Sequence, residues 1–321
     1  NDWPIYEEFL TGNNGLVEPK AIAIAENGSV LVLDGNQVKV FDEQKDLFKI
    51  YGKLDGEAGK DQGEFNGPRD IAFDSLGRLW VIDAGNYRVQ ILDKKGQYLF
   101  EIGSYGSLPG QFNSPSRIAI QGERAYVLDS GNYRIQIFAV NDGNFLGSFG
   151  IRGQDSGQFE EPTSIAIDDE GRVYVGDRGY QNHVLQFDAN GNFLDQIGYH
   201  LVNPTEHLGK FTIGGPVALV IRDGKVYAAD GGDRILVFSL DGSYEYEFGT
   251  NGSRVGRFNN VAYLKFDKHG RLYVLEETQK VTEAFTDRDF TRGQRIQRIT
   301  PPVEAGNVKG IAQRSKAERD L

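Results

Sequence analysis

The chain has 321 residues, and its 39% hydrophobic and 25% charged content is typical of a soluble globular protein. Its formal net charge of −11 argues against a general nucleic-acid binder, because such proteins usually carry a basic excess. Cysteine is absent, which excludes disulfides, thiolate metal sites and thiol nucleophiles.

Methionine is also absent, so the first residue is not an initiator. We therefore expect a removed signal peptide and an extracellular or periplasmic mature protein. An arbitrary chain boundary, or removal of the initiator alone, is the alternative interpretation. No apolar run reaches the roughly 18 residues that a membrane helix needs, so no membrane span is expected.

A recurring unit organises the chain from its first residues onward. Segment 4–10 resembles the apolar segments that end later units, such as residues 98–103 and 244–249. Full units then start near residues 15, 63, 110, 157, 209 and 256, and the last five starts read Gly-x-Phe. Repetition at such an interval is typical of a repeat architecture.

Each unit has the same internal order. In unit two, an apolar run at 70–73 is followed by a glycine turn, a second run at 79–82, an Asp-x-Gly-Asn corner at Asp83 and a third run at 88–92. Short runs of β-branched and aromatic residues between Gly, Asn and Asp turns predict four antiparallel strands per unit. Six such units predict an all-β, six-bladed β-propeller of four-stranded blades, formed by residues 1–302 as a single domain.

The sixth unit departs from this order, because residues 276–293 replace the short corner. We interpret 294–300 as its third strand, so that segment 4–10 supplies the fourth strand and closes the ring. The alternative makes 281–285 the third strand and 295–299 the fourth. Residues 303–321 form a polar tail that is either a short helix or a frayed terminus.

The unit pattern Gly-x-Phe, Pro, Ile-Ala, Gly-x-Leu-x-Val, Asp-x-Gly-Asn-x-Arg-Ile-Gln, Phe, Gly resembles the NHL repeat over residues 4–300. Unit four carries Asn182-His183-Val184, close to the letters of that name. NHL repeats typically form six-bladed propellers, so the resemblance implies the same fold. Relatives include RNA-binding domains, extracellular sensor domains and peptide-amidating lyases, so it implies no single function.

The corner acid and the arginine that follows it form a repeated charged pair. We expect each pair to link strands two and three of its own blade, because one activity does not need a pair copied around a ring. These structural pairs are Asp83 with Arg88, Asp129 with Arg134, and Asp230 with Arg234.

Metal sites are not expected. A lyase-type zinc site needs histidines that converge on one open position, but His269 lies in a turn on the face opposite His183, His200 and His207. Calcium prefers six or more oxygen ligands, and Asp70 is the only acid among the residues aligned at the inner-strand entrances. The matching positions in units five and six are Pro216-Val217 and Asn259-Asn260. We expect no cofactor and no catalytic residue.

Function is expected on the face that carries the unit-to-unit loops and the corners, where the irregular segments 199–208 and 276–293 lie. A basic ring at the channel mouth and its neighbours would receive an anionic ligand or an acidic protein. The alternative is a set of solvated cations paired with nearby acids. The candidate binding residues are Lys20, Arg69, Arg117, Arg178, Tyr180, His183, His200 and His207.

The leading hypothesis is an exported, non-catalytic binding or scaffold propeller that engages a protein or peptide partner, alone or as a subunit of a larger assembly. The first alternative is a metal-dependent propeller lyase or hydrolase. The second is a protein that binds single-stranded RNA through the basic mouth, which predicts a steep loss of affinity with salt.

Overall fold

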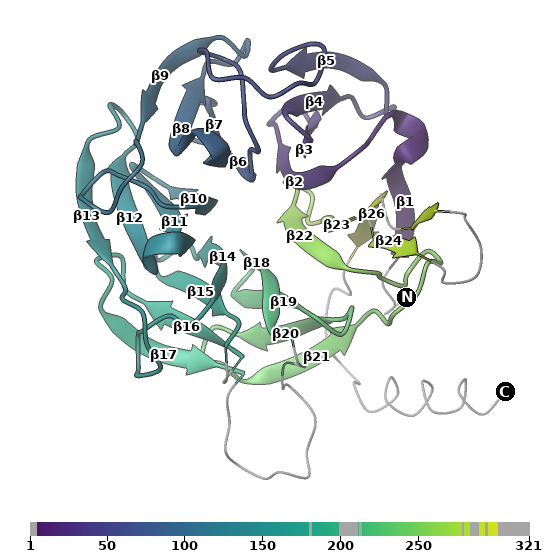
Figure 1. Ribbon diagram of the computed structural model, residues 1–321. Coiled ribbons are helices and arrows are strands. Elements are labelled where there is room, and N and C mark those ends of the chain that lie inside the picture. The colour runs from purple at the N-terminus through teal and green to yellow at the C-terminus, as the bar shows by residue number, and fades with distance from the viewer. Residues whose placement is uncertain are drawn as a thin grey trace, which may run out of the picture.

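Six four-stranded antiparallel sheets form a closed ring in the computed structural model of this chain (Figure 1). The structure describes residues 5–179, 182–198, 211, 214–277, 279–282, 289–292 and 295–300. The predicted fold, an all-β propeller with six four-stranded blades, is confirmed.

Blades 1 to 5 each use four consecutive strands, from the innermost to the outermost. Blades 1 and 2 consist of β2 (Pro19–Ile24), β3 (Val30–Asp34), β4 (Gln37–Phe41), β5 (Leu47–Tyr51), β6 (Asp70–Phe73), β7 (Leu79–Asp83), β8 (Arg88–Leu92) and β9 (Tyr98–Ile102). Blades 3 to 5 consist of β10 (Pro115–Gln121), β11 (Arg124–Asp129), β12 (Arg134–Ala139), β13 (Phe145–Phe149), β14 (Pro162–Ile167), β15 (Val173–Asp177), β16 (His183–Phe187), β17 (Phe193–Ile197), β18 (Pro216–Arg222), β19 (Lys225–Asp230), β20 (Ile235–Ser239) and β21 (Tyr244–Phe248).

Blade 6 joins the two ends of the propeller. Its order is β22 (Val261–Phe266), β23 (Leu272–Glu276), β26 (Arg295–Thr300) and then β1 (Ile5–Thr11) as the outer strand. The predicted closure by the N-terminal segment is therefore confirmed, and the alternative assignment of strands three and four is wrong. Part of the 276–293 segment forms a separate hairpin of β24 (Gln279–Thr282) and β25 (Asp289–Arg292). The predicted tail 303–321 lies outside the described residues.

Burial follows the radial position of the strands. In blades 1 to 4, the second strand and nearly all of the third strand are buried, because they lie between two neighbouring blades. The outer strands alternate exposed and half-buried residues. Clusters of buried apolar side chains therefore lie between adjacent blades rather than in one central core.

The ring has two distinct faces. We call the face with the blade-to-blade connections and the second-to-third strand corners the loop face, and the opposite face the turn face. The inner strands β2, β6, β10, β14, β18 and β22 each contact the next around the central channel, and β22 contacts β2. Within the described ranges, no helix is long and apolar enough to cross a bilayer.

Candidate functional site

The corner acid of each blade is a structural anchor. In blade 2, Asp83 is fully buried and accepts hydrogen bonds from Arg88 Nε at 2.7 Å and from the Asn66 backbone N–H at 2.7 Å. Arg88 also donates to the backbone carbonyls of Asp61 and Glu64. The pair therefore links strands two and three and also holds the loop that arrives from blade 1.

The same arrangement recurs around the ring with other residue types. The acid-to-base distances are 3.1 Å for Asp129 and Arg134, 2.9 Å for Asp230 and Arg234, 2.5 Å for Asp34 and Lys39, and 2.9 Å for Glu276 and Arg295. In blade 4, His183 replaces the cation and its Nε2 lies 3.8 Å from Asp177. Its Nδ1 is buried without a hydrogen-bond partner among the described residues. His183 is therefore part of a weaker corner and does not line the channel.

Two layers of side chains line the central channel. Each layer takes one residue from each inner strand. The first-layer residue pairs with the second-strand residue that immediately precedes the corner acid, and the second-layer residue follows two positions later in the inner strand. The first layer contains Ala21, Asp70, Arg117, Ser164, Ala218 and Tyr263. The second contains Ala23, Ala72, Ala119, Ala166, Val220 and Lys265. Most of these positions carry small apolar residues, of which Ala21, Ala23 and Ala72 are buried in the clusters between blades. The polar members of the two layers form one cluster.

That polar cluster converges from three blades. Asp70, from blade 2, is buried and accepts the backbone N–H groups of Ile118 and Ile71, both at 2.8 Å. The Tyr263 side chain, from blade 6, lies close enough to the Asp70 carboxylate for each group to shift the pKa of the other. The Arg117 guanidinium, from blade 3, lies 5.8 Å from the Tyr263 ring centre and donates from Nη1 to the Arg69 carbonyl at 3.4 Å.

Burial in this channel perturbs the ionisable groups. Desolvation raises the pKa of Asp70, which the Arg117 cation partly offsets. Desolvation and the neighbouring Asp70 carboxylate raise the pKa of Tyr263 well above its usual value. Desolvation lowers the pKa of Lys265, although Asp70 favours its charged form. Perturbed pKa values of this kind often mark functional sites, though they also occur in structural networks.

The predicted basic ring is only partly assembled at the mouth. Arg117 enters the channel, and Arg69 is exposed beside it, with a hydrogen bond from Nη1 to Ser114 Oγ at 3.4 Å. Lys20 lies 3.5 Å from Glu18, and Arg178 forms an ion pair with Glu161. These two residues therefore fit the alternative interpretation, in which surface cations pair with nearby acids. Tyr180, His200 and His207 lie outside the described residues.

Exposed apolar side chains also gather on the loop face. Tyr87, in the blade 2 corner, is in edge contact with Tyr105 from the next blade-to-blade loop, with ring centres 4.8 Å apart. Tyr105 and Leu108 are each 66% exposed, and Ile151, in the following loop, is 62% exposed. Exposed aromatic and apolar residues beside arginines are typical of protein-binding surfaces.

Sequence reasoning missed Tyr263 and Lys265. It aligned Asn259-Asn260 and Pro216-Val217 with the channel entrances, and this was wrong for both units. A register shift after Val261 places Tyr263 in the first layer, opposite Leu275. The repeat does contain the information needed to find Lys265. The five remaining second-layer positions are alanine or valine, so a lysine at the sixth is unusual once the strand register is known.

Replacing Lys265 by methionine is expected to raise the free energy of unfolding at pH 7 by about 0.5–2 kcal/mol, the usual range for a stabilising substitution. The unfolded chain keeps the Lys265 proton up to its usual pKa of 10.5, whereas the folded protein releases it at lower pH. Between the folded-state and unfolded-state pKa of Lys265, the unfolded state therefore binds more protons. In that pH range the free energy of unfolding of the wild-type protein increases as pH rises.

Urea unfolding of both proteins between pH 8 and 10 checks this expectation, because the stability difference should shrink with rising pH. Equal unfolding free energies at every pH would contradict the assignment of Lys265 to a desolvated channel position. Lys95→Met, at an exposed turn, is the matched control.

No group of three or more histidine, aspartate or glutamate side chains is placed to hold a metal ion within the described part of the chain. The backbone N–H of His269 donates to Asp267 in a turn-face turn. The channel cluster offers one carboxylate, one phenol and two cations, which is chemistry suited to holding an anion rather than a metal.

Comparisons with known proteins agree with this architecture. A family model described as a 6-bladed beta-propeller matches residues 111–208, and an NHL repeat model matches residues 65–92. The chain is 35% identical over 71 residues to Protein brain tumor of Drosophila melanogaster, and 32% identical over 85 residues to NHL repeat-containing protein 3 of Homo sapiens. These matches cover 22% and 25% of this chain but only 7% and 24% of those proteins.

Solved structures with similar folds include enzymes. A catalytically inactive variant of virginiamycin B lyase from Staphylococcus aureus, with quinupristin, has a TM-score of 0.61 at 13% identity over 93% of this chain and 99% of that one. A gluconolactonase from Xanthomonas campestris has a TM-score of 0.58 at 16% identity over 89% and 87%. At such identities the likeness extends to the fold alone.

Proposed function

We propose that this six-bladed β-propeller, which matches an NHL repeat model at residues 65–92, is a non-catalytic binding module for an acidic protein or peptide partner. The partner lies on the loop face, and one of its carboxylates enters the channel mouth beside Arg69 and Arg117. The predicted extracellular or periplasmic location remains a prediction.

The observation that supports this proposal is the excess of positive charge at the channel. Arg117 lies beside Asp70 and donates to the carbonyl of the exposed Arg69, whereas Asp70 is buried and already accepts two backbone N–H groups. In a chain with a net charge of −11 this excess is local. An exposed guanidinium favours a carboxylate, which it can bind through two hydrogen bonds.

The exposed Tyr87 and Tyr105 pair supplies a contact for an apolar side chain of the same partner. Aromatic side chains offer a large contact area with few rotatable bonds, so they lose little entropy on binding. Because Tyr87 belongs to blade 2, as does Arg69, the cationic and aromatic parts of the surface lie on one blade and its neighbouring loop.

Selection from a random peptide library on the immobilised protein tests the proposal. The expected peptides contain Asp or Glu near an aromatic residue. We expect Arg69→Glu to weaken their binding at least tenfold, equivalent to about 1.4 kcal/mol. Lys95→Glu, a charge reversal on the turn face, should leave binding unchanged.

Two results would contradict the proposal. One is a set of selected peptides that bind the wild type and Arg69→Glu equally well. The other is stoichiometric zinc or calcium in elemental analysis of native protein, because that would favour the metal-dependent lyase or hydrolase. A preference for single-stranded RNA over acidic peptides would favour the remaining alternative.

A further inference from the structure

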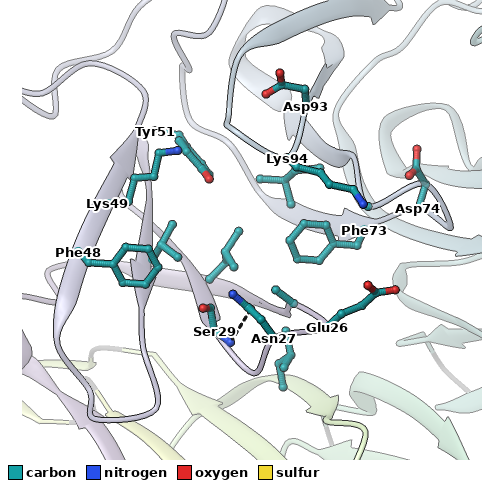
Figure 2. A pocket seen from close by; sticks show the side chains of 16 residues that line it. Glu26, Asn27, Ser29, Phe48, Lys49, Tyr51, Phe73, Asp74, Asp93 and Lys94 are labelled. Atoms are coloured by element: carbon teal, nitrogen blue, oxygen red, sulfur yellow. Dashed lines mark hydrogen bonds between the residues drawn. The ribbon is translucent and has the colours of Figure 1, made fainter.

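A pocket of about 340 Å³ opens between blades 1 and 2 (Figure 2). It lies on the turn face, opposite the loop face on which the partner is proposed to bind. Its floor is apolar and includes Leu31, Val40 and Leu79. Phe48 and Phe73 stand on opposite sides of it, from β5 and from the end of β6. Pockets of this size and lining hold small molecules in other proteins.

The repeat explains why the pocket is open. In the five other blades, the second strand carries a buried aromatic residue that packs toward the next blade. By register these aromatics are Trp80, Tyr126, Tyr174, Tyr227 and Tyr273, and blade 1 has Leu31 at the same position. Leu31 lines the pocket, which therefore occupies space that a larger ring fills in every other blade.

A cation is missing from the same place. Two residues before each aromatic, the other blades carry Arg78, Arg124, Arg172, Lys225 and Arg271, whereas blade 1 has Ser29. Ser29 also lines the pocket. In blade 2, Arg78 Nε and Trp80 Nε1 both donate to the Asp74 carboxylate, and the position of Asp74 is occupied in blade 1 by Ala25, another pocket residue. Blade 1 thus lacks the cation and the aromatic ring that the five other blades carry, and also the acid that blades 2, 4 and 6 carry.

The missing side chains have a defined bonding role in neighbouring interfaces. Arg124 Nη1 and Tyr126 Oη both donate to the Ala189 carbonyl, in the turn between the outer strands of the next blade, at 3.0 and 3.1 Å. Arg78 Nη2 donates in the same way to the Val140 carbonyl at 2.5 Å. The corresponding turn of blade 2 contains Asp93 and Lys94, and both line the pocket.

We propose that this pocket binds a small planar aromatic molecule that carries an amino group. The ring would lie on Leu31 where the repeat's aromatic residue is absent, and the amino group would replace the absent cation at the 93–96 turn. Among the carboxylates of the lining, Asp74 is buried and paired with Arg78, so Glu26 and Asp93 are left to face Lys49 and Lys94. The choice of an amine therefore rests on the cation that the five other blades carry two residues before the aromatic and that blade 1 lacks.

The walls are held in place without a ligand. Lys49 Nζ donates to the Lys95 carbonyl at 2.6 Å and lies 4.9 Å from the centre of the Tyr51 ring. Tyr51 in turn packs against Gly96, where a Cβ atom would collide with the ring. Because these contacts tie blade 1 to blade 2 across the mouth, the pocket is preformed, which lowers the entropic cost of binding.

Saturation-transfer NMR and calorimetry with tryptamine and tyramine test the proposal, with indole-3-acetate as the anionic comparison. We expect saturable one-to-one binding of at least one amine and at least tenfold weaker binding of the acid. Leu31→Trp, which restores the aromatic residue of the other blades, should reduce amine binding at least tenfold and raise the unfolding temperature. Leu194→Trp, the same change at an exposed site in blade 4, should change neither.

Ser29→Arg is a second variant, which restores the missing cation and should compete with the amino group even if Leu31→Trp does not fold. Failure of both amines to bind at 10 mM would overturn the proposal, as would binding that Leu31→Trp and Ser29→Arg leave unchanged. Because the pocket and the loop face are separate, Arg69→Glu should not affect amine binding, so the two proposals can fail independently.

Discussion

Replacing Asp83 by alanine is expected to lower the free energy of unfolding by about 3–5 kcal/mol, because it removes the fully buried counter-ion of the Arg88 guanidinium. Arg88 is 8% exposed, and its remaining described acidic partner is Glu101 at 2.9 Å. The substitution also removes the acceptor of the Asn66 backbone N–H and of Gln90 Nε2. Unsatisfied buried donors add to the cost.

Urea unfolding of the wild type, Asp83→Ala, Arg88→Met and the double variant measures this effect. The double variant should be less destabilised than the sum of the single changes, because the unpaired charge is then removed as well. Asp55→Ala, at an exposed position 3.7 Å from Lys53, is the control and should cost less than about 1 kcal/mol. An equally small cost for Asp83→Ala would contradict the anchoring role of the corner.

Deleting residues 1–11 is expected to abolish cooperative unfolding of the propeller. The deletion removes β1, which carries Leu10 at 0% and Phe9 at 2% exposure, and it leaves β26 as an uncovered sheet edge. It also removes the edge contact of Phe9 with Tyr273, whose ring centres are 5.3 Å apart. Loss of Leu10 alone should cost about 2–5 kcal/mol, the usual range for a buried leucine replaced by alanine.

Calorimetry of the truncated chain, with and without a synthetic peptide of residues 1–14, checks this prediction. The peptide should restore a cooperative transition, because an extended segment can add to an exposed sheet edge. Glu7→Ala in the full chain is the control: it removes the partly exposed ion pairs with Arg298 and Lys45 and should cost less than about 1 kcal/mol. A truncated chain that melts like the full chain would show that β1 is dispensable.

The ring and its closure could be predicted from sequence because the same pattern of strands and turns recurs in six units. Arg295-Ile296-Gln297 matches the third strand of unit three, and this match correctly assigned β26 and left β1 to complete blade 6. The corner pairs were recognisable for the same reason: an acid and an arginine that recur at equivalent positions in units two, three and five have a role in the unit.

The channel cluster and the turn-face pocket could not be predicted in the same way. The register shift after Val261 in β22 recurs in the inner strands of blades 1, 3, 4 and 5, so Tyr263 and Lys265 are recognised only once the inner strands are aligned on that shift. The pocket arises from smaller residues at Ala25, Ser29 and Leu31, none of which is unusual for a strand or turn. Only comparison with the side chains that fill the equivalent space in other blades makes their small size meaningful.

Hydrogen exchange measured by mass spectrometry on the complex with a selected acidic peptide tests the proposed binding face most directly. Protection is expected in the loop-face segments around Arg69 and Tyr105, with no change in the turn-face segments 74–78 and 93–97. Protection confined to the turn face, or to the outer strands, would contradict the account.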